Sequence, residues 1–251
     1  MSAIEGLLLD IDGVLAVSWE AVPGAVQAMT SLRAEGVPFR LITNTTTHTR
    51  RDLAATLHDA GFEVEADEIV TAVTATASYL RDHHAGGRAF VLTDGGPGED
   101  LAGVPIAGTL QEADVIVIGG ASDAFTYETV NGIFRRLMDG IALVGMHRNL
   151  YWKTSQGWEL DGGAYIAGLE EASGTNAVIC GKPAPTYFQT ALGLLGVPAA
   201  RAAMVGDDIT NDVEGARAAG MERSSRGSRR STSGWAPCCR SARIPAGADP
   251  S

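Results

Sequence analysis

The sequence is poor in cysteine, and its three cysteines do not form a recognisable framework. Cys238 and Cys239 are adjacent, and Cys180 stands alone in a chain of 251 residues. A disulfide-stabilised domain would need more pairs, and a structural zinc site would need spaced pairs of ligands. Both are therefore excluded as the basis of the fold. Cys180 follows an apolar stretch, where we expect a buried thiol.

Long apolar runs are also missing. The runs at 6–9, 115–118 and 141–144 are each four residues long, which suits buried strands and is far too short to cross a membrane. Residues 1–9 carry Glu5 and no basic residue before their apolar run, unlike a secretory signal. We therefore expect a cytoplasmic protein that does not bind a membrane.

Positive charge is scarce. The chain has 19 lysines and arginines against 30 aspartates and glutamates, a net charge of -11, and its only lysines are Lys153 and Lys182. A surface of this sign repels the phosphate backbone of DNA and RNA, so no nucleic-acid partner is expected. A small phosphorylated substrate stays possible if a metal ion or a few cations neutralise it locally.

Strand-like and helix-like segments alternate along the chain. Helical spacing of apolar residues follows short apolar runs, and glycines end several of the expected helices. This alternation predicts an α/β fold with a doubly wound parallel sheet, a Rossmann-like core, and an inserted α/β cap domain. The expected strands are 7–9, 39–42, 89–92, 115–118, 141–144, 177–180 and 202–205; the expected helices are 24–35, 49–60, 74–83, 127–138, 163–172, 185–195 and 212–219.

The chain has two acidic motifs, at residues 10–12 and 207–212, and a motif around Lys182, and their positions divide it into segments. Residues 75–177 contain none of them, so we predict that they form the inserted cap, between a first core segment at 1–74 and a second at 178–221.

Residues 222–251 differ abruptly in composition. They hold six arginines, seven serines and two acids, with almost no apolar periodicity. This pattern indicates either a disordered end or a shift of reading frame near Met221. In the family that the motifs described below resemble, an apolar strand follows at this point, so this resemblance implies that the core sheet loses an edge strand there.

Two carboxylates, Asp10 and Asp12, follow the first expected strand. Residues two apart in an extended chain point the same way, so both can reach one site. Asp10 can attack phosphorus, and Asp12 can protonate the leaving oxygen and then deprotonate water. The alternative is an ordinary turn, which Asp and Gly also favour.

Two further groups with donors follow other strands. Thr43 and Asn44 can donate hydrogen bonds to phosphate oxygens, although, taken alone, the segment is better explained as a cap for the next helix, which residues 45–49 could supply. Lys182 follows the strand expected at 177–180, where its ammonium can hold phosphoryl oxygens. The alternative is an exposed lysine at a turn.

A fourth group, the acidic cluster of Asp207, Asp208 and Asp212, follows the strand expected at 202–205. Magnesium prefers oxygen ligands, so Asp207 can bind it directly, while Asp208 and Asp212 can hold its waters or orient Lys182. These acids can also complement a helix N-terminus. Because the carboxyl ends of parallel strands meet at one rim, we expect all four groups to converge. The hypothesis requires the Asp10 and Asp207 carboxylates to lie within about 8 Å of each other.

Together, the ordered motifs resemble those of haloacid dehalogenase-like phosphatases. The matching residues are Asp10-Ile-Asp12-Gly-Val, Thr43-Asn44, Gly-Lys182-Pro and Gly-Asp207-Asp208 followed by Asp212. The long insertion is similar to the large α/β cap of the NagD-like branch. Within it, the segments that begin at Glu128 and Gly163 resemble the phospholysine phosphohistidine inorganic pyrophosphate phosphatase group.

The resemblance implies a role for each motif residue. It makes Asp10 the nucleophile and a Mg²⁺ ligand, and Asp12 the acid/base whose backbone carbonyl also binds Mg²⁺. Asp207 becomes the third protein ligand, while Thr43, Asn44 and Lys182 hold the phosphoryl group. It also implies cap residues over the site near 148–153 and pairing of two chains through their caps. The alternatives are a sugar-phosphate phosphotransferase and a phosphate-compound-binding or scaffold protein without turnover.

Overall fold

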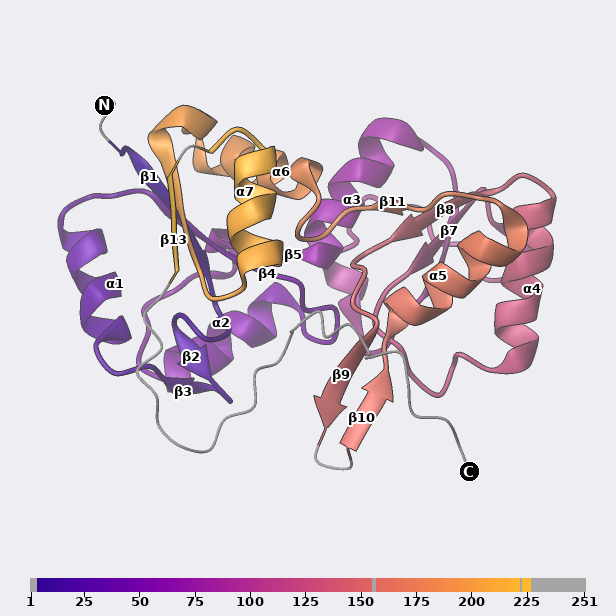
Figure 1. Cartoon of the computed structure of the whole chain (residues 1–251), viewed down its shortest axis with the longest axis horizontal. Coiled ribbons are helices and arrows are strands. Elements are labelled where there is room, and N and C mark those ends of the chain that lie inside the picture. The colour runs from indigo at the N-terminus through magenta and orange to yellow at the C-terminus, as the bar shows by residue number, and fades with distance from the viewer. Residues whose placement is uncertain (1–3, 155–156, 222, 227–251) are drawn as a thin grey trace, which may run out of the picture.

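Two parallel β-sheets lie side by side in the molecule (Figure 1). The structure is a computed structural model, and it describes residues 4–154, 157–221 and 223–226. The first sheet has the order β13-β12-β1-β4-β5, and the second has the order β11-β8-β7-β6. Their strands are β1 Gly6–Asp10, β4 Phe39–Thr43, β5 Ile69–Thr71, β12 Ala202–Gly206 and β13 Arg223–Arg226, then β6 Ala89–Leu92, β7 Val115–Ile118, β8 Ala142–Gly145 and β11 Val178–Ile179.

Helices connect the strands and cover both faces of each sheet. The α-helices are α1 Ala25–Ala34, α2 Arg50–Asp59, α3 Ala72–His83, α4 Tyr127–Met138, α5 Gly162–Ser173, α6 Pro185–Leu195 and α7 Gly215–Ala218. Shorter turns are η1 Ala66–Glu68, η2 Pro97–Glu99, η3 Leu110–Glu112, η4 Ala199–Arg201 and the π-helical η5 Ile209–Glu214. Two hairpins, β2 Ala16–Val17 with β3 Glu20–Ala21 and β9 Tyr151–Thr154 with β10 Gly157–Leu160, complete the described elements.

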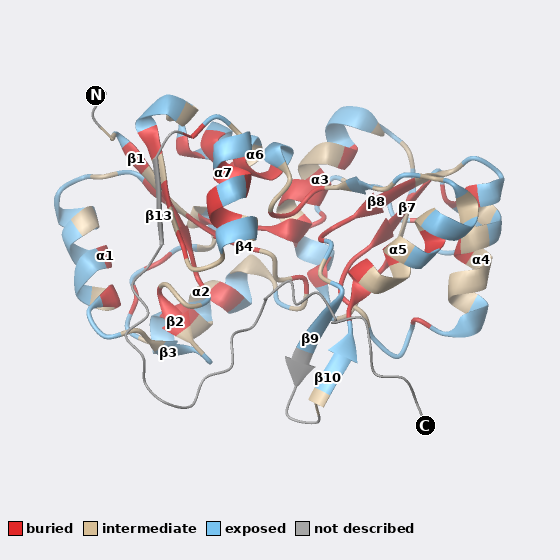
Figure 2. Cartoon of the chain, in the orientation of Figure 1, coloured by how far each residue is buried: buried red, intermediate tan, exposed pale blue. Residues whose placement is uncertain are grey.

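The first sheet buries alternate side chains against opposite helix layers. Leu8 and Ile42 face α6 and α7, whereas Leu9 and Leu41 face α1 and α2. Successive strand residues point to opposite faces, so a strand covered on both sides is apolar throughout. Figure 2 shows the consequence, with buried strands between helices whose outer faces are exposed. This layering is the doubly wound core that the alternation of the sequence predicts.

The second sheet is covered in the same way and shares one helix with the first. Helices α4 and α5 pack on one face, and α3 packs on the other. Ala75 of α3 also belongs to the core of the first sheet. Helix α3, which begins at Ala72, therefore joins the two sheets instead of starting the second one.

The strand expected at 177–180 is present but lies in a different sheet. Val178 and Ile179 pair in parallel with Val144 and Gly145 of β8. The sequence pattern places this strand in the second core segment, beginning at 178. That assignment is wrong for these two residues, because a short apolar run does not specify which sheet it joins. The chain returns to the first sheet only at Gly181 and Lys182, which contact its loops.

The expected loss of an edge strand after Met221 is also wrong. Residues 223–226 form β13, which pairs in parallel with β12 from Ala203 to Gly206. Backbone pairing requires donors and acceptors but no apolar periodicity, so composition alone does not exclude such a strand. The rest of the predicted atypical tail, residue 222 and residues 227–251, lies outside the described residues.

None of the helices within the described ranges is long and apolar enough to span a membrane.

Candidate active site

The predicted site lies where three neighbouring strands of the first sheet end. Asp10 is the last residue of β1, the central strand between β12 and β4, and its side chain is buried. Asp12 follows in a tight turn and is exposed. Gly13, at a φ of 78°, brings this turn against Asp207, since a Cβ on Gly13 would lie 2.5 Å from the Asp207 Oδ2 atom. Glycine is the residue that permits this approach.

Lys182 is buried between two carboxylates. Its Nζ atom lies 2.7 Å from the Asp10 Oδ1 atom and 2.8 Å from the Asp212 Oδ1 atom. The relative exposures of Asp10, Lys182 and Asp212 are 5%, 5% and 0%. The alternative of an exposed lysine at a turn is therefore wrong. The contact with Asp212 fits the predicted orienting role of that carboxylate.

The protonation of this network follows from burial and charge. Burial raises the pKa of Asp10 to about 8, although the Lys182 ammonium opposes the shift. Burial acts to lower the pKa of Lys182, but Asp10 and Asp212 outweigh it and raise that pKa. Lys182 is thus a stable cation. Asp12 is exposed as a residue, yet desolvation raises its pKa; Lys182 opposes this shift and Asp212 adds to it.

Asn44 fixes the loop that carries Lys182. The Lys182 backbone N–H donates to the Asn44 Oδ1 atom at 2.7 Å, and the Asn44 Nδ2 atom donates to the Lys182 carbonyl oxygen at 3.0 Å. From the sequence, we expect Asn44 to donate to the phosphoryl group. In the structure, the oxygen and one hydrogen of its amide instead hold the backbone of Lys182.

Thr43 is buried at the end of β4 beside Tyr187, a residue that the sequence motifs do not include. The Thr43 hydroxyl accepts a bond from the Thr45 backbone N–H at 3.2 Å. The Tyr187 hydroxyl accepts from the Thr43 N–H at 3.0 Å, and it lies 2.7 Å from the carbonyl oxygen of Val70. Tyr187 thus ties α6 to the ends of β4 and β5. In the sequence it is one more residue of the buried face of a helix, so no local signal marks it.

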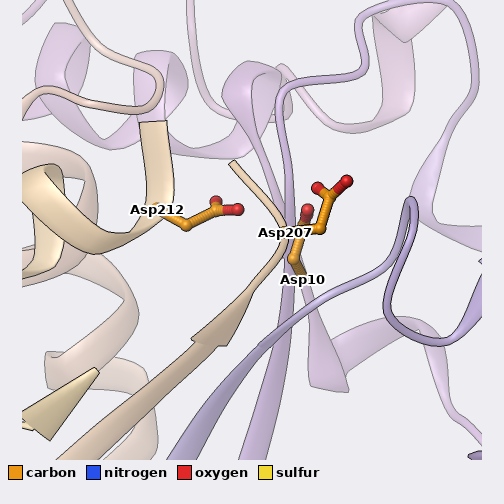
Figure 3. A group of neighbouring side chains, drawn as sticks. All are labelled: Asp10, Asp207 and Asp212. Atoms are coloured by element: carbon orange, nitrogen blue, oxygen red, sulfur yellow. The ribbon is translucent and has the colours of Figure 1, made fainter. Parts of the chain in front are cut away.

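The acidic residues that follow β12 make two kinds of contact. Asp208 caps η5, because its Oδ1 atom accepts from the N–H groups of Thr210 and Asn211 at 2.8 and 2.9 Å. This matches the capping alternative for that residue. Asp207 and Asp212 instead face Asp10, and one carboxylate oxygen from each of the three lies within 4.8 Å of the others. Figure 3 shows the Asp212 carboxyl group directed toward the other two.

These three carboxylates fit a divalent cation. The distance between Asp10 and Asp207 meets the requirement set from the sequence, since it is well below about 8 Å. Lys182 is the lysine that contacts the group, and it pairs with Asp10 and Asp212. Clustered carboxylates repel each other unless a proton or a cation lies among them. The donor set, all carboxylate oxygen, is of the kind that Mg²⁺ takes.

The second sheet presents a polar cluster at the ends of its own strands. Asp94 follows β6, and the Thr46 hydroxyl of the first sheet's β4–α2 loop donates to it at 3.2 Å. His147 follows β8 and is buried, with its Nε2 atom 3.9 Å from an Asp161 carboxylate oxygen. Burial lowers the pKa of His147, while Asp161 and Asp94 oppose that shift. Arg148, predicted near the site, pairs with Glu170 of α5.

The comparisons with known proteins agree with this geometry. A sequence model described as haloacid dehalogenase-like hydrolase matches residues 7–107, and one described as HAD-hydrolase-like matches residues 179–224. Haloacid dehalogenase-like hydrolase domain-containing protein 2 of Mus musculus is 36% identical over 219 residues, which cover 87% of this chain and 82% of the relative. The chain belongs to the haloacid dehalogenase-like hydrolase family.

Other relatives confirm the NagD-like branch of this family. The phospholysine phosphohistidine inorganic pyrophosphate phosphatase of Rattus norvegicus is 34% identical over 227 residues, covering 88% of this chain and 82% of its own. The p-nitrophenyl phosphatase from Archaeoglobus fulgidus has a TM-score of 0.82 at 29% identity, with 88% and 85% coverage. NagD from E. coli has a TM-score of 0.79 at 28% identity, with 88% and 87% coverage. The haloacid dehalogenase-like core with an α/β cap, predicted from the motifs, is confirmed.

Proposed function

We propose that this haloacid dehalogenase-like hydrolase is a magnesium-dependent phosphatase that hydrolyses small phosphorylated compounds through an aspartyl phosphate on Asp10. The observation that carries the proposal is the buried group of Asp10, Lys182 and Asp212 beside Asp207 at one rim of the sheet. A carboxylate nucleophile, a fixed ammonium and a cation-binding set of oxygens are what phosphoryl transfer requires. The names of the phosphatase relatives support the same activity.

In the first half-reaction, Asp10 takes up the phosphoryl group. One Asp10 oxygen forms a bond to phosphorus while the bond from phosphorus to the leaving oxygen breaks. Asp12 gives its proton to that leaving oxygen, and the raised pKa of Asp12 favours a protonated carboxyl group for this step. Lys182 stabilises the negative charge on the phosphoryl oxygens.

In the second half-reaction, water releases the phosphate. Asp12, now a carboxylate, takes a proton from the water while the water oxygen bonds to phosphorus. The bond between phosphorus and Asp10 breaks, so inorganic phosphate leaves and both carboxyl groups return to their first state. Thr43 and Asn44 act with Lys182 in holding the phosphoryl group. Asn44 does so through the loop of Lys182 that it fixes.

The carboxylates of Asp10 and Asp207 and the backbone carbonyl of Asp12 would hold Mg²⁺. When bound, the ion neutralises charge on the phosphoryl group and polarises its oxygens. Asp212 acts on this arrangement by orienting Lys182, and Asp208 acts by fixing the start of η5. A small phosphorylated substrate is the proposed partner. Pairing through the caps, a cytoplasmic location and the absence of nucleic-acid and membrane partners stay predictions.

Hydrolysis of p-nitrophenyl phosphate with Mg²⁺, repeated with EDTA and with Asp10→Asn, tests this function. We expect turnover that EDTA and Asp10→Asn each abolish, while circular dichroism shows the variant folded. Intact-mass measurement after an acid quench should show one added phosphoryl group, absent from Asp10→Asn. Turnover retained in the variant would reject Asp10 as the nucleophile. Binding of phosphate compounds without turnover by the unmodified chain would favour the scaffold alternative.

A further inference from the structure

The turn between β2 and β3 has a backbone conformation that its residues ordinarily avoid. Val17 pairs with Glu20, which leaves only Ser18 and Trp19 in the turn. Both have positive φ, at 50° and 65°. Two-residue hairpin turns of this kind favour Asn and Gly, and a bulky residue in the left-handed region is uncommon. Such conformations persist where the surroundings impose them, and they concentrate at functional sites.

The turn displays the indole of Trp19 instead of burying it. Trp19 is 39% exposed, although Trp is among the side chains that gain most from burial. Its ring meets the imidazole of His48 edge-on, with centroids 5.9 Å apart and planes at 67°. The His48 Nδ1 atom lies 2.7 Å from the Thr47 hydroxyl, which fixes the imidazole. The contact with His48 therefore holds the indole in place while leaving part of it free.

Both rings belong to loops that leave the rim of the candidate site. Trp19 follows Asp12 in the loop after β1, and His48 follows Asn44 in the loop after β4. Strands β1 and β4 are parallel neighbours, so these loops start from the same edge. In Figure 1 the β2–β3 hairpin lies at the lower side of the half that holds the first sheet, and β9 and β10 extend from the lower side of the half that holds the second sheet.

The loop of His48 also reaches the second sheet. Its Thr46 binds Asp94, and its Thr47 backbone lies against Gly95, where a Cβ would be 2.4 Å from the Thr47 carbonyl oxygen. The loop that carries His48 thus contacts the second sheet, and Trp19 packs against this loop on the side of the first sheet. The leaving group of a substrate whose phosphoryl group is at Asp10 extends beyond the rim from which both loops start.

We propose that Trp19, steadied by His48, stacks on the leaving group of the substrate, and that the preferred substrates are phosphate monoesters of planar aromatic or heteroaromatic alcohols. This inference rests on the proposed phosphatase function. A partly exposed indole face offers offset stacking to a second ring and gains little from a short aliphatic chain. Trp19 is therefore a specificity-determining residue that takes no part in proton or phosphoryl transfer.

Three variants separate the aromatic ring from the geometry of the turn. Trp19→Leu removes the ring system but keeps an apolar side chain, and Trp19→Phe keeps a smaller ring. Ser18→Asn is the matched control, because Asn tolerates the left-handed region and leaves the indole unchanged. Each is assayed in the full chain with Mg²⁺ on p-nitrophenyl phosphate and on glycerol 3-phosphate, and each variant is compared with the unmodified chain on the same substrate.

We expect Trp19→Leu to lower kcat/KM for p-nitrophenyl phosphate by about three- to tenfold, mainly through KM, the loss expected from one aromatic pair. The value for glycerol 3-phosphate should change less than about twofold, within the effect expected of a surface substitution. Trp19→Phe should recover part of the loss, and Ser18→Asn should behave like the unmodified chain. Equal losses on both substrates, or no loss on either, would overturn the proposal.

A binding measurement keeps this inference separate from the proposed function. Nitrobenzylphosphonate, which carries a nitroaryl ring and is not hydrolysed, should quench the tryptophan fluorescence of the unmodified chain more than that of Trp19→Phe. If neither ester is hydrolysed by the unmodified chain but this difference is present, the phosphatase function fails and the stacking role stands. If both esters are hydrolysed and the quenching is the same in both proteins, the stacking role fails alone.

Discussion

At the scale of single residues, removal of the Asp12 carboxylate should lower the rate of proton transfer without disturbing the buried ion pairs of Lys182. It is exposed, whereas Asp10, Lys182 and Asp212 are buried around their ion pairs. We expect Asp12→Asn to lower kcat by about 10²–10⁴-fold, the usual contribution of a general acid/base. Glu20→Gln, another exposed acid in the same loop, should change kcat little. Steady-state kinetics with Mg²⁺ measure both, and a normal rate in Asp12→Asn would assign the proton transfer to another group.

Lys182 is the residue whose removal should cost the most stability. It is the lysine that faces the buried carboxylates of Asp10 and Asp212. Removing one partner from a buried ion pair costs about 3–5 kcal/mol, because the other charge is left without a partner. We expect Lys182→Met to lower the free energy of unfolding by that amount in urea titrations without metal.

The decrease in the free energy of unfolding caused by Lys182→Met should depend on pH in a definite direction. Without the ammonium, the pKa of Asp10, which burial already raises, rises further above its unfolded value, so the folded state favours the protonated form. The contribution of Asp10 to stability is then present at low pH and is lost as the pH rises through the folded-state pKa. The difference from the unmodified chain should therefore be smaller near about pH 5 than near about pH 8. A difference that grows toward low pH would show that Lys182 does not neutralise these carboxylates.

At the scale of elements, the buried Asp100 carboxylate links the segment after η2 to the start of α2. The Asp100 side chain accepts from the Arg50 backbone N–H at 2.8 Å and from the Arg50 Nε atom at 2.7 Å. Asp100 thus satisfies a free N–H at the start of α2 and complements its dipole. We expect Asp100→Ala to lower the free energy of unfolding by about 1–3 kcal/mol, since two partly buried donors lose their acceptor.

Glu99 supplies the matched control for Asp100. It pairs with Arg51 at 3.2 Å, but both side chains are exposed. Exposed ion pairs contribute about 0–1 kcal/mol, so Glu99→Ala should be close to neutral. Urea titration of both variants measures the difference. If the two substitutions cost the same, the tie between Asp100 and Arg50 does not stabilise the fold.

The local sequence pattern predicts where the helices and strands lie better than it predicts which strands pair with one another. Helix α2 was expected at 49–60 and spans Arg50–Asp59, with Thr49 as its cap, because capping and apolar spacing are local properties. The sheet that Val178–Ile179 joins depends on contacts far away in sequence, and the pattern contains no trace of them. The Ser18–Trp19 turn could not be expected either, since its residues disfavour the conformation that the structure gives them.

At the scale of the whole molecule, the convergence of the site was predictable because it follows from sheet topology. Asp10, Thr43 and Asp207 each end or follow a strand, and parallel neighbours bring those ends to one rim. The contacts that refine the site were not predictable. The amide of Asn44 on the backbone of Lys182 spans 138 residues, and the bond from Tyr187 to Thr43 spans 144. Such pairs depend on how α6 packs, which motif spacing does not encode.

A cation that binds where the two core segments meet should stabilise the entire fold. Asp10 comes from the first segment and Asp207 from the second, so an ion that both carboxylates hold binds only the folded chain. Mg²⁺ at about 100 times its Kd should then raise the free energy of unfolding by about 2.7 kcal/mol. Thermal unfolding with and without Mg²⁺ measures this gain, which Asp207→Asn should remove. Asp114→Asn, at an exposed ion pair with Arg88, should retain it. An unchanged Tm in the unmodified chain at saturating Mg²⁺ would show that these carboxylates do not form a magnesium site.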